Sequence, residues 1–270
     1  MAAQAGVSDW AGRRVLVTGA SSGIGAALAR DLAGQGAIVG MCARRTDLLD
    51  EVLDECRRHV PACQAWAVDL GELDGLEDFV AQVERELGGI DTLVNNAAAV
   101  LSGTTDGTPW ADVERLVQTN YLSPVRLTLA ALPAMRARGA GQIAVVSSMA
   151  ARMATPGESA YAASKAALSA WFESLAAELW DSPISVHLVY PALIEVESDV
   201  DGDDALADSP NAAKHIPAPV CARAIRRQLE RGDLELYVPT PVKQGVVMRM
   251  NDPEGSIQIM ADWFRSNPQH

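Results

Sequence analysis

Short apolar runs alternate with amphipathic segments along most of the chain. The apolar runs predict seven buried strands, at 14–18, 37–43, 64–69, 90–95, 142–147, 184–190 and 234–238. Between them, a helical period predicts helices at 26–33, 47–59, 72–87, 110–138, 161–180 and 219–231. Pro124 and Pro133 are expected to kink or divide the helix at 110–138. Strand alternating with helix indicates an α/β fold, a doubly wound parallel sheet of seven strands flanked by helices on both faces.

The whole chain of 270 residues is expected to form a single domain, residues 1–270, because no linker, internal repeat or low-complexity run interrupts it. Residues 195–216 follow the sixth predicted strand and are acidic, small and polar, with no apolar period. We interpret them as a substrate-loop insertion, a lid that orders over the substrate. The alternative is a plain solvated loop.

Charge and cysteine content narrow the classes of partner and location. The formal net charge of −13 disfavours nucleic acid and anionic membranes as partners. The four cysteines form no Cys-x-x-Cys pair and have no His cluster beside them, so we expect reduced thiols and no metal site. The N-terminal sequence lacks the pattern of a signal peptide, and no apolar run approaches the ~20 residues of a membrane-spanning helix. We therefore expect a soluble cytoplasmic protein.

A glycine-rich turn, Gly19-Ala-Ser-Ser-Gly23-Ile-Gly25, follows the first predicted strand and opens the first helix. Free backbone N–H groups at a helix N-terminus bind the pyrophosphate of a dinucleotide, and glycine lets the backbone approach it closely. The alternative is a tight strand–helix turn that binds no ligand. The position directly after a buried strand favours the dinucleotide.

The stretch at 147–167 contains three residues that could carry out proton chemistry. Tyr161 and Lys165 are four residues apart, so on a helix they share one face. A nearby cation favours the phenolate and lowers the pKa of a tyrosine, which can then exchange a proton with a carbonyl or alcohol oxygen. Ser148, at the end of the fifth predicted strand, could steady the same oxygen. Tyr-x-x-x-Lys also occurs by chance in amphipathic helices.

Other polar residues fall at the carboxyl ends of predicted strands, where ligands bind in parallel sheets. Asn95-Asn96-Ala97-Ala98 closes the fourth strand and either faces the ligand or caps the loop. Asp69 closes the third strand and either caps the next turn or contacts an adenine amine. Asn120 lies inside a predicted helix, which Asn disfavours, so it either marks a local irregularity or is simply solvated.

The end of the second predicted strand indicates the cofactor. A site specific for NAD usually has a carboxylate there, to bind the adenine ribose. This chain has Ala43, followed by Arg44 and Arg45. A guanidinium can grip a 2′-phosphate with a fork of donors, so the pair favours NADP(H), with Arg44 as the first candidate. The alternative is a pair of solvated arginines, and the glycine turn itself contains no Lys or Arg.

Together these motifs are Thr18-Gly19-x-x-x-Gly23-x-Gly25, Asp69, Asn95-Asn96-Ala97, Asn120, Ser148 and Tyr161-x-x-x-Lys165. In this order and spacing, from Gly12 to about Pro239, the chain resembles the short-chain dehydrogenase/reductase (SDR) family in its compact single-domain branch. The resemblance implies an NAD(P)-binding Rossmann-type fold. The family pattern has glycine where this chain has Ala98 and Ala192, and often threonine at Val196, so the nicotinamide contacts could differ.

The resemblance also implies a role for each catalytic position. Tyr161 is the general acid/base, and Lys165 lowers its pKa and binds the nicotinamide ribose. Ser148 orients the substrate oxygen, and Asn120 holds a water in a proton relay through Lys165. Ile194 binds the nicotinamide carboxamide through its backbone.

The expected site therefore has three parts. The catalytic residues are Asn120, Ser148, Tyr161 and Lys165. The cofactor-binding residues are Gly19, Ser21, Ser22, Gly23, Ile24, Gly25, Arg44, Arg45, Asp69, Leu70, Asn96, Ala97, Ala98, Tyr161, Lys165, Pro191, Ala192 and Ile194. The substrate-binding residues are Ser148, Ala150, Met153, Tyr161, Tyr190 and Leu193, which would give a mostly apolar pocket.

The function expected from this set is an NADP(H)-dependent oxidoreductase, a ketoreductase that interconverts a ketone or aldehyde and an alcohol by hydride transfer. NAD(H) is the alternative cofactor, and we expect a homodimer or homotetramer with a small-molecule substrate that the sequence does not name. A redox-sensing regulatory protein that binds a dinucleotide without turnover is the alternative function. A scaffold that merely shares the fold would need no glycine turn.

Overall fold

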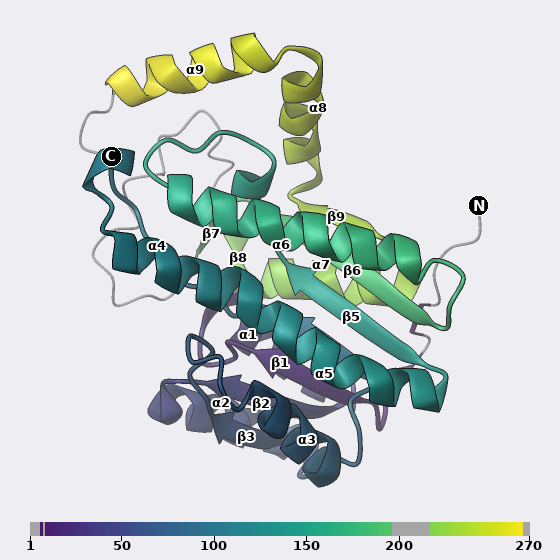
Figure 1. Ribbon diagram of the computed structural model, residues 1–270. Helices are drawn as coiled ribbons and strands as arrows, with labels where there is room; N and C mark the ends of the chain where they lie inside the picture. Colours follow the sequence, from purple (N-terminus) through teal and green to yellow (C-terminus); the bar gives the residue numbers. More distant parts are fainter. Residues whose placement is uncertain (1–5, 8, 196–215, 267–270) are drawn as a thin grey trace.

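The computed structural model describes residues 6–7, 9–195 and 216–266, and its centre is a sheet of seven parallel strands (Figure 1). In spatial order the strands are β3 (Gln64–Ala67), β2 (Ile38–Ala43), β1 (Arg14–Thr18), β4 (Thr92–Asn95), β5 (Gly141–Val146), β6 (Ile184–Pro191) and β9 (Glu235–Val238). The direction of strand order reverses between β1 and β4. A ligand crevice is expected at the carboxyl ends of the strands beside such a reversal.

Helices cover both faces of the sheet, as the sequence predicts. One face is covered by α1 (Gly23–Gly34), α2 (Thr46–His59) and α7 (Ala218–Arg231). The other face is covered by α3 (Leu76–Leu87), α5 (Ser123–Arg138) and α6 (Ser159–Glu178), and α4 (Trp110–Val117) packs on α6. None of the described helices is both long and apolar enough to cross a membrane.

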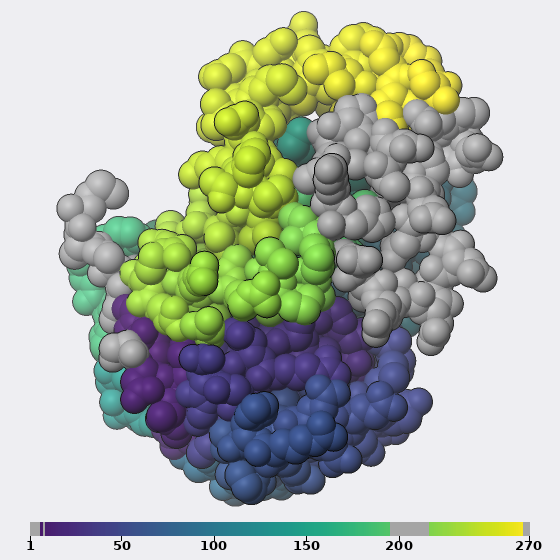
Figure 2. All heavy atoms as spheres, turned by 180° about the vertical axis from the view of Figure 1, so that it is seen from behind, coloured from purple at the N-terminus to yellow at the C-terminus, as the bar shows by residue number. Residues whose placement is uncertain are grey.

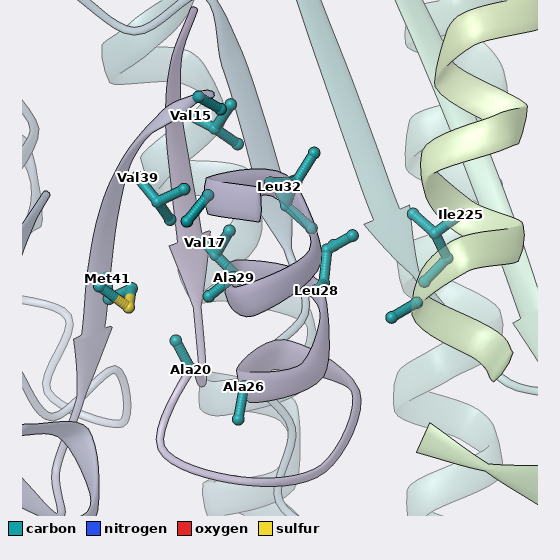
Figure 3. Packing of buried hydrophobic residues seen from close by; sticks show 14 of the residues in the cluster. Val15, Val17, Ala20, Ala26, Leu28, Ala29, Leu32, Val39, Met41 and Ile225 are labelled. Atoms are coloured by element: carbon teal, nitrogen blue, oxygen red, sulfur yellow. The ribbon is translucent and has the colours of Figure 1, made fainter. Parts of the chain in front are cut away.

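The central strand β1 shows how the two apolar layers are built. Val15 and Val17 point to one face, where they pack with Leu28 of α1 and Ile225 of α7 (Figure 3). Leu16 points to the opposite face and joins the layer under α3, α5 and α6. Because successive residues of a strand alternate between faces, a strand covered on both sides must be apolar throughout. This is why the short apolar runs predict the strands correctly.

The helix predicted at 110–138 is divided, and only one of its two prolines explains the division. After α4 the chain makes one turn of π-helix, Gln118–Leu122, before α5 begins at Ser123. Pro124 directly follows the π-turn and has no N–H to donate to the carbonyl oxygen of Asn120, four residues before, so the α-helical bonding is interrupted there. Pro133 lies inside α5 without ending it. Asn120 sits in the π-turn, which confirms the expectation of a local irregularity.

The hydrophobic pattern predicts no element after residue 238, yet two further helices follow. They are α8 (Lys243–Asn251) and α9 (Pro253–Ser266), which stand out from the body as an arm (Figure 2). Several large apolar side chains of the arm are exposed, among them Met250 and Ile257. In α8 the apolar residues Val247, Met248 and Met250 are exposed and form no buried stripe, whereas α9 has apolar residues at helical spacing that sequence reasoning missed.

Two short strands close the ends of the predicted substrate loop. β7 (Ile194–Glu195) pairs with β8 (Ile216–Pro217), so the chain leaves and re-enters the described structure at one place. The predicted loop at 195–216, including Val196, otherwise lies outside the described residues. Its role as a lid stays a prediction.

Candidate active site

A cavity of about 800 Å³ opens at the carboxyl edge of the sheet, beside the reversal between β1 and β4. This volume is in the range of sites for cofactors and small molecules. The cavity is lined by the turn after β1, by the residues that follow β2 to β6, by the start of α6 and by the segment after β9. Of the residues expected in the site, all line it except Gly25, Asn120 and Tyr190.

The turn after β1 needs glycine at two positions, because the chain packs too closely there for a Cβ. Gly19 has a φ of +66°, and a Cβ on it would lie 2.7 Å from the Cα of Ala97. A Cβ on Gly25 would lie 2.3 Å from the carbonyl oxygen of Gly19, so Gly25 supports the turn from beneath instead of lining the cavity. No side chain caps the N-terminus of α1, which leaves its first N–H groups available for an anion.

Thr18 and Asn96 fix the glycine turn against the end of β4. The Thr18 hydroxyl accepts hydrogen bonds from the backbone N–H groups of Asn96 and Ala97, both at 3.0 Å. The side-chain amide of Asn96 donates back to the carbonyl oxygen of Thr18 at 2.8 Å. Asn96 therefore lies in the cavity wall, as predicted, and its amide holds two strand ends together.

The two arginines after β2 lie at one end of the cavity, but they have different neighbours. Arg45 donates to the Ser22 hydroxyl at 2.5 Å and lies 3.4 Å from that of Ser21, so it faces the glycine turn. Arg44 lies 3.9 Å from the Asp69 carboxylate. Asp69 in turn accepts the backbone N–H of Gly71 at 2.8 Å. Asp69 thus caps its own turn and also lines the cavity, so both of its expected roles remain open.

Ser148 and Tyr161 meet in the wall of the cavity, next to the end of β5. Ser148 follows Ser147 in extended conformation, and its hydroxyl accepts the N–H of Ala150 at 3.1 Å. Tyr161, near the start of α6, lines the same part of the cavity, close enough for the Ser148 hydroxyl to act on the pKa of its phenol. Lys165 lies one turn further along α6, with its Nζ 5.9 Å from the centre of the Tyr161 ring. The sequence spacing therefore brings these three side chains together as expected.

Burial dominates the protonation of the tyrosine and the lysine. Loss of hydration raises the pKa of Tyr161 to about 12, although the neighbouring Ser148 hydroxyl acts in the opposite direction. Loss of hydration also lowers the pKa of Lys165 to about 7. The expectation that Lys165 lowers the pKa of Tyr161 is therefore not met here. The Lys165 ammonium donates to the carbonyl oxygen of Val146 at 2.9 Å, away from the phenol.

Asn120 lies behind the cavity, and its side chain is occupied by three hydrogen bonds. Its Oδ1 accepts the N–H of Ala99 at 2.7 Å, and its Nδ2 donates to the carbonyl oxygen of Ala99 at 2.9 Å and to the Ser164 hydroxyl at 3.0 Å. The π-turn aims this amide at the segment after β4 and at α6. The amide thus joins three elements of the site, and a role in a proton relay stays a prediction.

The prediction that Tyr190 lines the substrate pocket is wrong. Tyr190 is fully buried and stacks on Tyr237 with ring centres 5.0 Å apart. Its hydroxyl donates to Glu173 at 3.0 Å and accepts from Arg152, whose guanidinium lies over the ring. The alternation of β6 turns this side chain into the apolar layer below the cavity. The last residue before Pro191 therefore faces the core.

The rest of the substrate side is mostly apolar. Ala150, Met153 and Leu193 line the cavity, as expected. Sequence reasoning missed a group after β9, consisting of Pro239, Pro241, Val242 and Gly245. The carboxyl-edge rule could have found them, because they follow directly on the last strand of the sheet.

The comparisons with known proteins agree with this geometry. The family model for "short chain dehydrogenase" matches residues 13–205. A fatty acyl-CoA reductase of Mycobacterium tuberculosis is 40% identical over 189 residues, which are 68% of this chain and 64% of that protein. The chain spans less than two thirds of the length of the first curated relatives that it matches.

Solved structures show the same fold with nicotinamide dinucleotides bound. A metagenomic short-chain oxidoreductase in complex with NADP is 29% identical, with a TM-score of 0.71 over 84% of this chain and 96% of that one. A short chain dehydrogenase/reductase from Burkholderia phymatum in complex with NAD is 18% identical, with a TM-score of 0.83 over 92% of this chain and 96% of that one. The second likeness concerns the fold alone.

Proposed function

The chain belongs to the short chain dehydrogenase family, and on that premise we propose that it is an NADP(H)-dependent oxidoreductase that interconverts a carbonyl and an alcohol. The observation that carries the proposal is that Ser148, Tyr161 and Lys165 line one wall of the cavity onto which the glycine turn opens. A proton donor beside a dinucleotide site is what hydride transfer to a carbonyl requires. A protein that only senses redox state would need no such donor.

Different residues along the cavity would bind different parts of the cofactor. The N–H groups at the start of α1 would hold the pyrophosphate, and Tyr161 with Lys165 would lie at the nicotinamide ribose. The backbone of Ile194 would lie at the carboxamide. When bound, the nicotinamide supplies or accepts the hydride. The departures at Ala98 and Ala192 both lie in the cavity lining, so their effect falls on cofactor contacts and not on the proton donor.

In the direction of reduction, Tyr161 gives its proton to the carbonyl oxygen while the Ser148 hydroxyl holds that oxygen in place. The high pKa of Tyr161, about 12, keeps the phenol protonated at neutral pH, ready to donate. Lys165, whose pKa is lowered to about 7, gains or loses a proton within the physiological range. A charged Lys165 would stabilise the phenolate left behind.

The adenine end of the cavity supports NADP(H) over NAD(H). A 2′-phosphate carries between one and two negative charges at neutral pH and accepts several hydrogen bonds. Arg44, Arg45, Ser21 and Ser22 offer two cations and two hydroxyls around one end of the cavity. The metagenomic oxidoreductase is bound to NADP. Arg45 now ranks beside Arg44, because it is the arginine held next to the glycine turn.

The experiment that tests the proposal is a spectrophotometric screen of NADPH oxidation against a panel of ketones and aldehydes. The panel should include apolar compounds, since the relative from M. tuberculosis is named a fatty acyl-CoA reductase. Turnover with at least one apolar carbonyl compound is expected. Tight binding of NADPH without turnover on any of them would favour the redox sensor instead.

A further inference from the structure

A second hollow lies beneath the C-terminal arm, outside the expected site. Its volume is about 470 Å³, which is in the range of ligand pockets. Its floor is formed by Ala154, Thr155, Pro156, Ser159 and Ala162, and its roof by one face of α9, consisting of Ile257, Met260, Ala261 and Phe264. In Figure 1, α9 lies above the start of α6, on the side of the molecule where this floor lies.

The hollow is chemically uniform. Its lining is apolar apart from the hydroxyls of Thr155 and Ser159, and both hydroxyls already have partners. The Thr155 hydroxyl donates to the carbonyl oxygen of Met153 at 3.4 Å, and that of Ser159 accepts from Thr105 at 3.1 Å. A polar or charged ligand would lose its hydration here with little in return. A hydrocarbon fits this chemistry.

The floor of the hollow is the same stretch of chain that carries the proton donor. Four of its five residues lie between Ser148 and Tyr161, the fifth follows Tyr161 directly, and Thr155 lines both the hollow and the main cavity. A molecule with its carbonyl at Ser148 and Tyr161 could therefore extend past Thr155 and under α9. Thr155 therefore marks the place where the hollow adjoins the main cavity.

Contacts between α8 and the rim of the cavity hold the arm in place, so that α9 lies over the hollow. Gly245 of α8 packs against Met153, with so little room that a Cβ on it would lie 3.2 Å from the Met153 sulfur. Arg249 of α8 donates to the carbonyl oxygen of Arg152 at 3.1 Å. Both contacts are made to the stretch that joins Ser148 to Tyr161, so the arm and the reacting groups share one support.

We propose that this hollow, which we call the tail pocket, binds the hydrocarbon tail of the substrate whose carbonyl is held at Ser148 and Tyr161. The substrate class is then a ketone or aldehyde with a linear apolar chain of medium length or longer. The proposal rests on the proposed function for the position of the carbonyl. It goes beyond it in assigning a tail site to the arm.

The test compares methyl ketones from butan-2-one to decan-2-one with NADPH. In the wild type, kcat/KM should rise by at least about tenfold across the series, since each fully buried methylene can contribute up to about fourfold. Ala261→Phe, which fills the roof of the tail pocket, should bring the ratio of decan-2-one to butan-2-one close to one. Ile259→Phe, at an exposed position of the same helix, is the matched control and should keep the wild-type ratio.

Two results would overturn the tail pocket while leaving the proposed function intact. One is turnover of ketones with no dependence on chain length in the wild type. The other is an Ala261→Phe variant that keeps the wild-type ratio. If no ketone is turned over, the proposed function fails, and calorimetric titration with decan-2-one decides about the pocket alone. Wild-type binding that Ala261→Phe abolishes would support the pocket, and equal binding or none would reject it.

Discussion

At the scale of single residues, Arg44 and Arg45 supply positive charge at the end of the cavity where we propose that the adenine of the cofactor binds. They lie where a carboxylate would otherwise select NAD, in a chain of net charge −13. We predict a preference for NADPH over NADH of at least about tenfold in kcat/KM, on the order of 1.4 kcal/mol. Arg44→Ala and Arg45→Ala should each reduce the preference, and the double variant should abolish most of it.

The control for this prediction is Arg58→Ala, since Arg58 is exposed in the last turn of α2 and lies outside the cavity lining. It should keep the wild-type ratio of the two cofactors. Steady-state kinetics with both cofactors in all four variants measures the ratio. A wild type that uses NADH and NADPH equally would show that the arginines do not select the phosphate.

Lys165 is the second residue whose environment predicts a measurable effect. Burial lowers its pKa from 10.5 to about 7, so between these values the unfolded chain holds a proton that the folded protein lacks. The free energy of unfolding should therefore rise with pH from about 7 upwards, toward about 10.5. Lys165→Met should flatten this rise. Urea unfolding at pH 6.5, 8 and 9 measures it, and identical pH slopes in both proteins would contradict it.

At the scale of elements, a half-buried ionic cluster around Arg152, which directly follows η3 (Met149–Ala151), joins this segment to β6. Arg152 contacts Glu173, the Tyr190 hydroxyl and Glu235. The cluster thereby joins the stretch after Ser148 to α6, β6 and β9. The cluster lies outside the lining of the main cavity and supports, from below, the residues that form the cavity wall after Ser148.

This arrangement predicts how Tyr190→Phe behaves. The change removes a hydroxyl bonded to Glu173 and Arg152, so the free energy of unfolding should fall by about 1–3 kcal/mol. The KM for the carbonyl substrate should stay within about twofold of the wild-type value, because the ring lies below the cavity. Denaturant unfolding and steady-state kinetics together check this. A KM raised tenfold in a protein of wild-type stability would contradict this account and indicate that Tyr190 contacts the substrate.

At the scale of the whole molecule, stability rests on two apolar layers, one on each face of the sheet. Leu28 of α1 is fully buried in one of them, between β1 and α7 (Figure 3). Leu28→Ala should lower the free energy of unfolding by about 2–5 kcal/mol, because the remaining core closes only partly around the lost methyl groups. Leu129→Ala, at an exposed position on α5, should change it by less than about 0.5 kcal/mol. Equal losses in the two variants would contradict this account of the core.

The burial of the sheet on both faces also explains which features the sequence could predict. Strands buried on both faces must be apolar throughout, so their apolar runs could be recognised in the sequence. Gly19 and Gly25 could also be recognised, because close contacts in the turn leave no room for a Cβ. The face of Tyr190 was not visible, because neighbouring residues of a strand point to opposite layers. The arm was also missed: α8 has exposed apolar residues that form no buried stripe, and α9 has an apolar face at helical spacing that sequence reasoning did not use.

The central claim is that Tyr161 gives the proton in a reduction that uses NADPH. The most direct measurement is kcat for the best ketone or aldehyde in wild type and Tyr161→Phe, together with the Kd for NADPH. The account predicts that kcat falls by about 10²–10⁴-fold, the usual contribution of a positioned general acid, while the Kd changes little. A Phe variant whose kcat stays within tenfold of the wild-type value would contradict it.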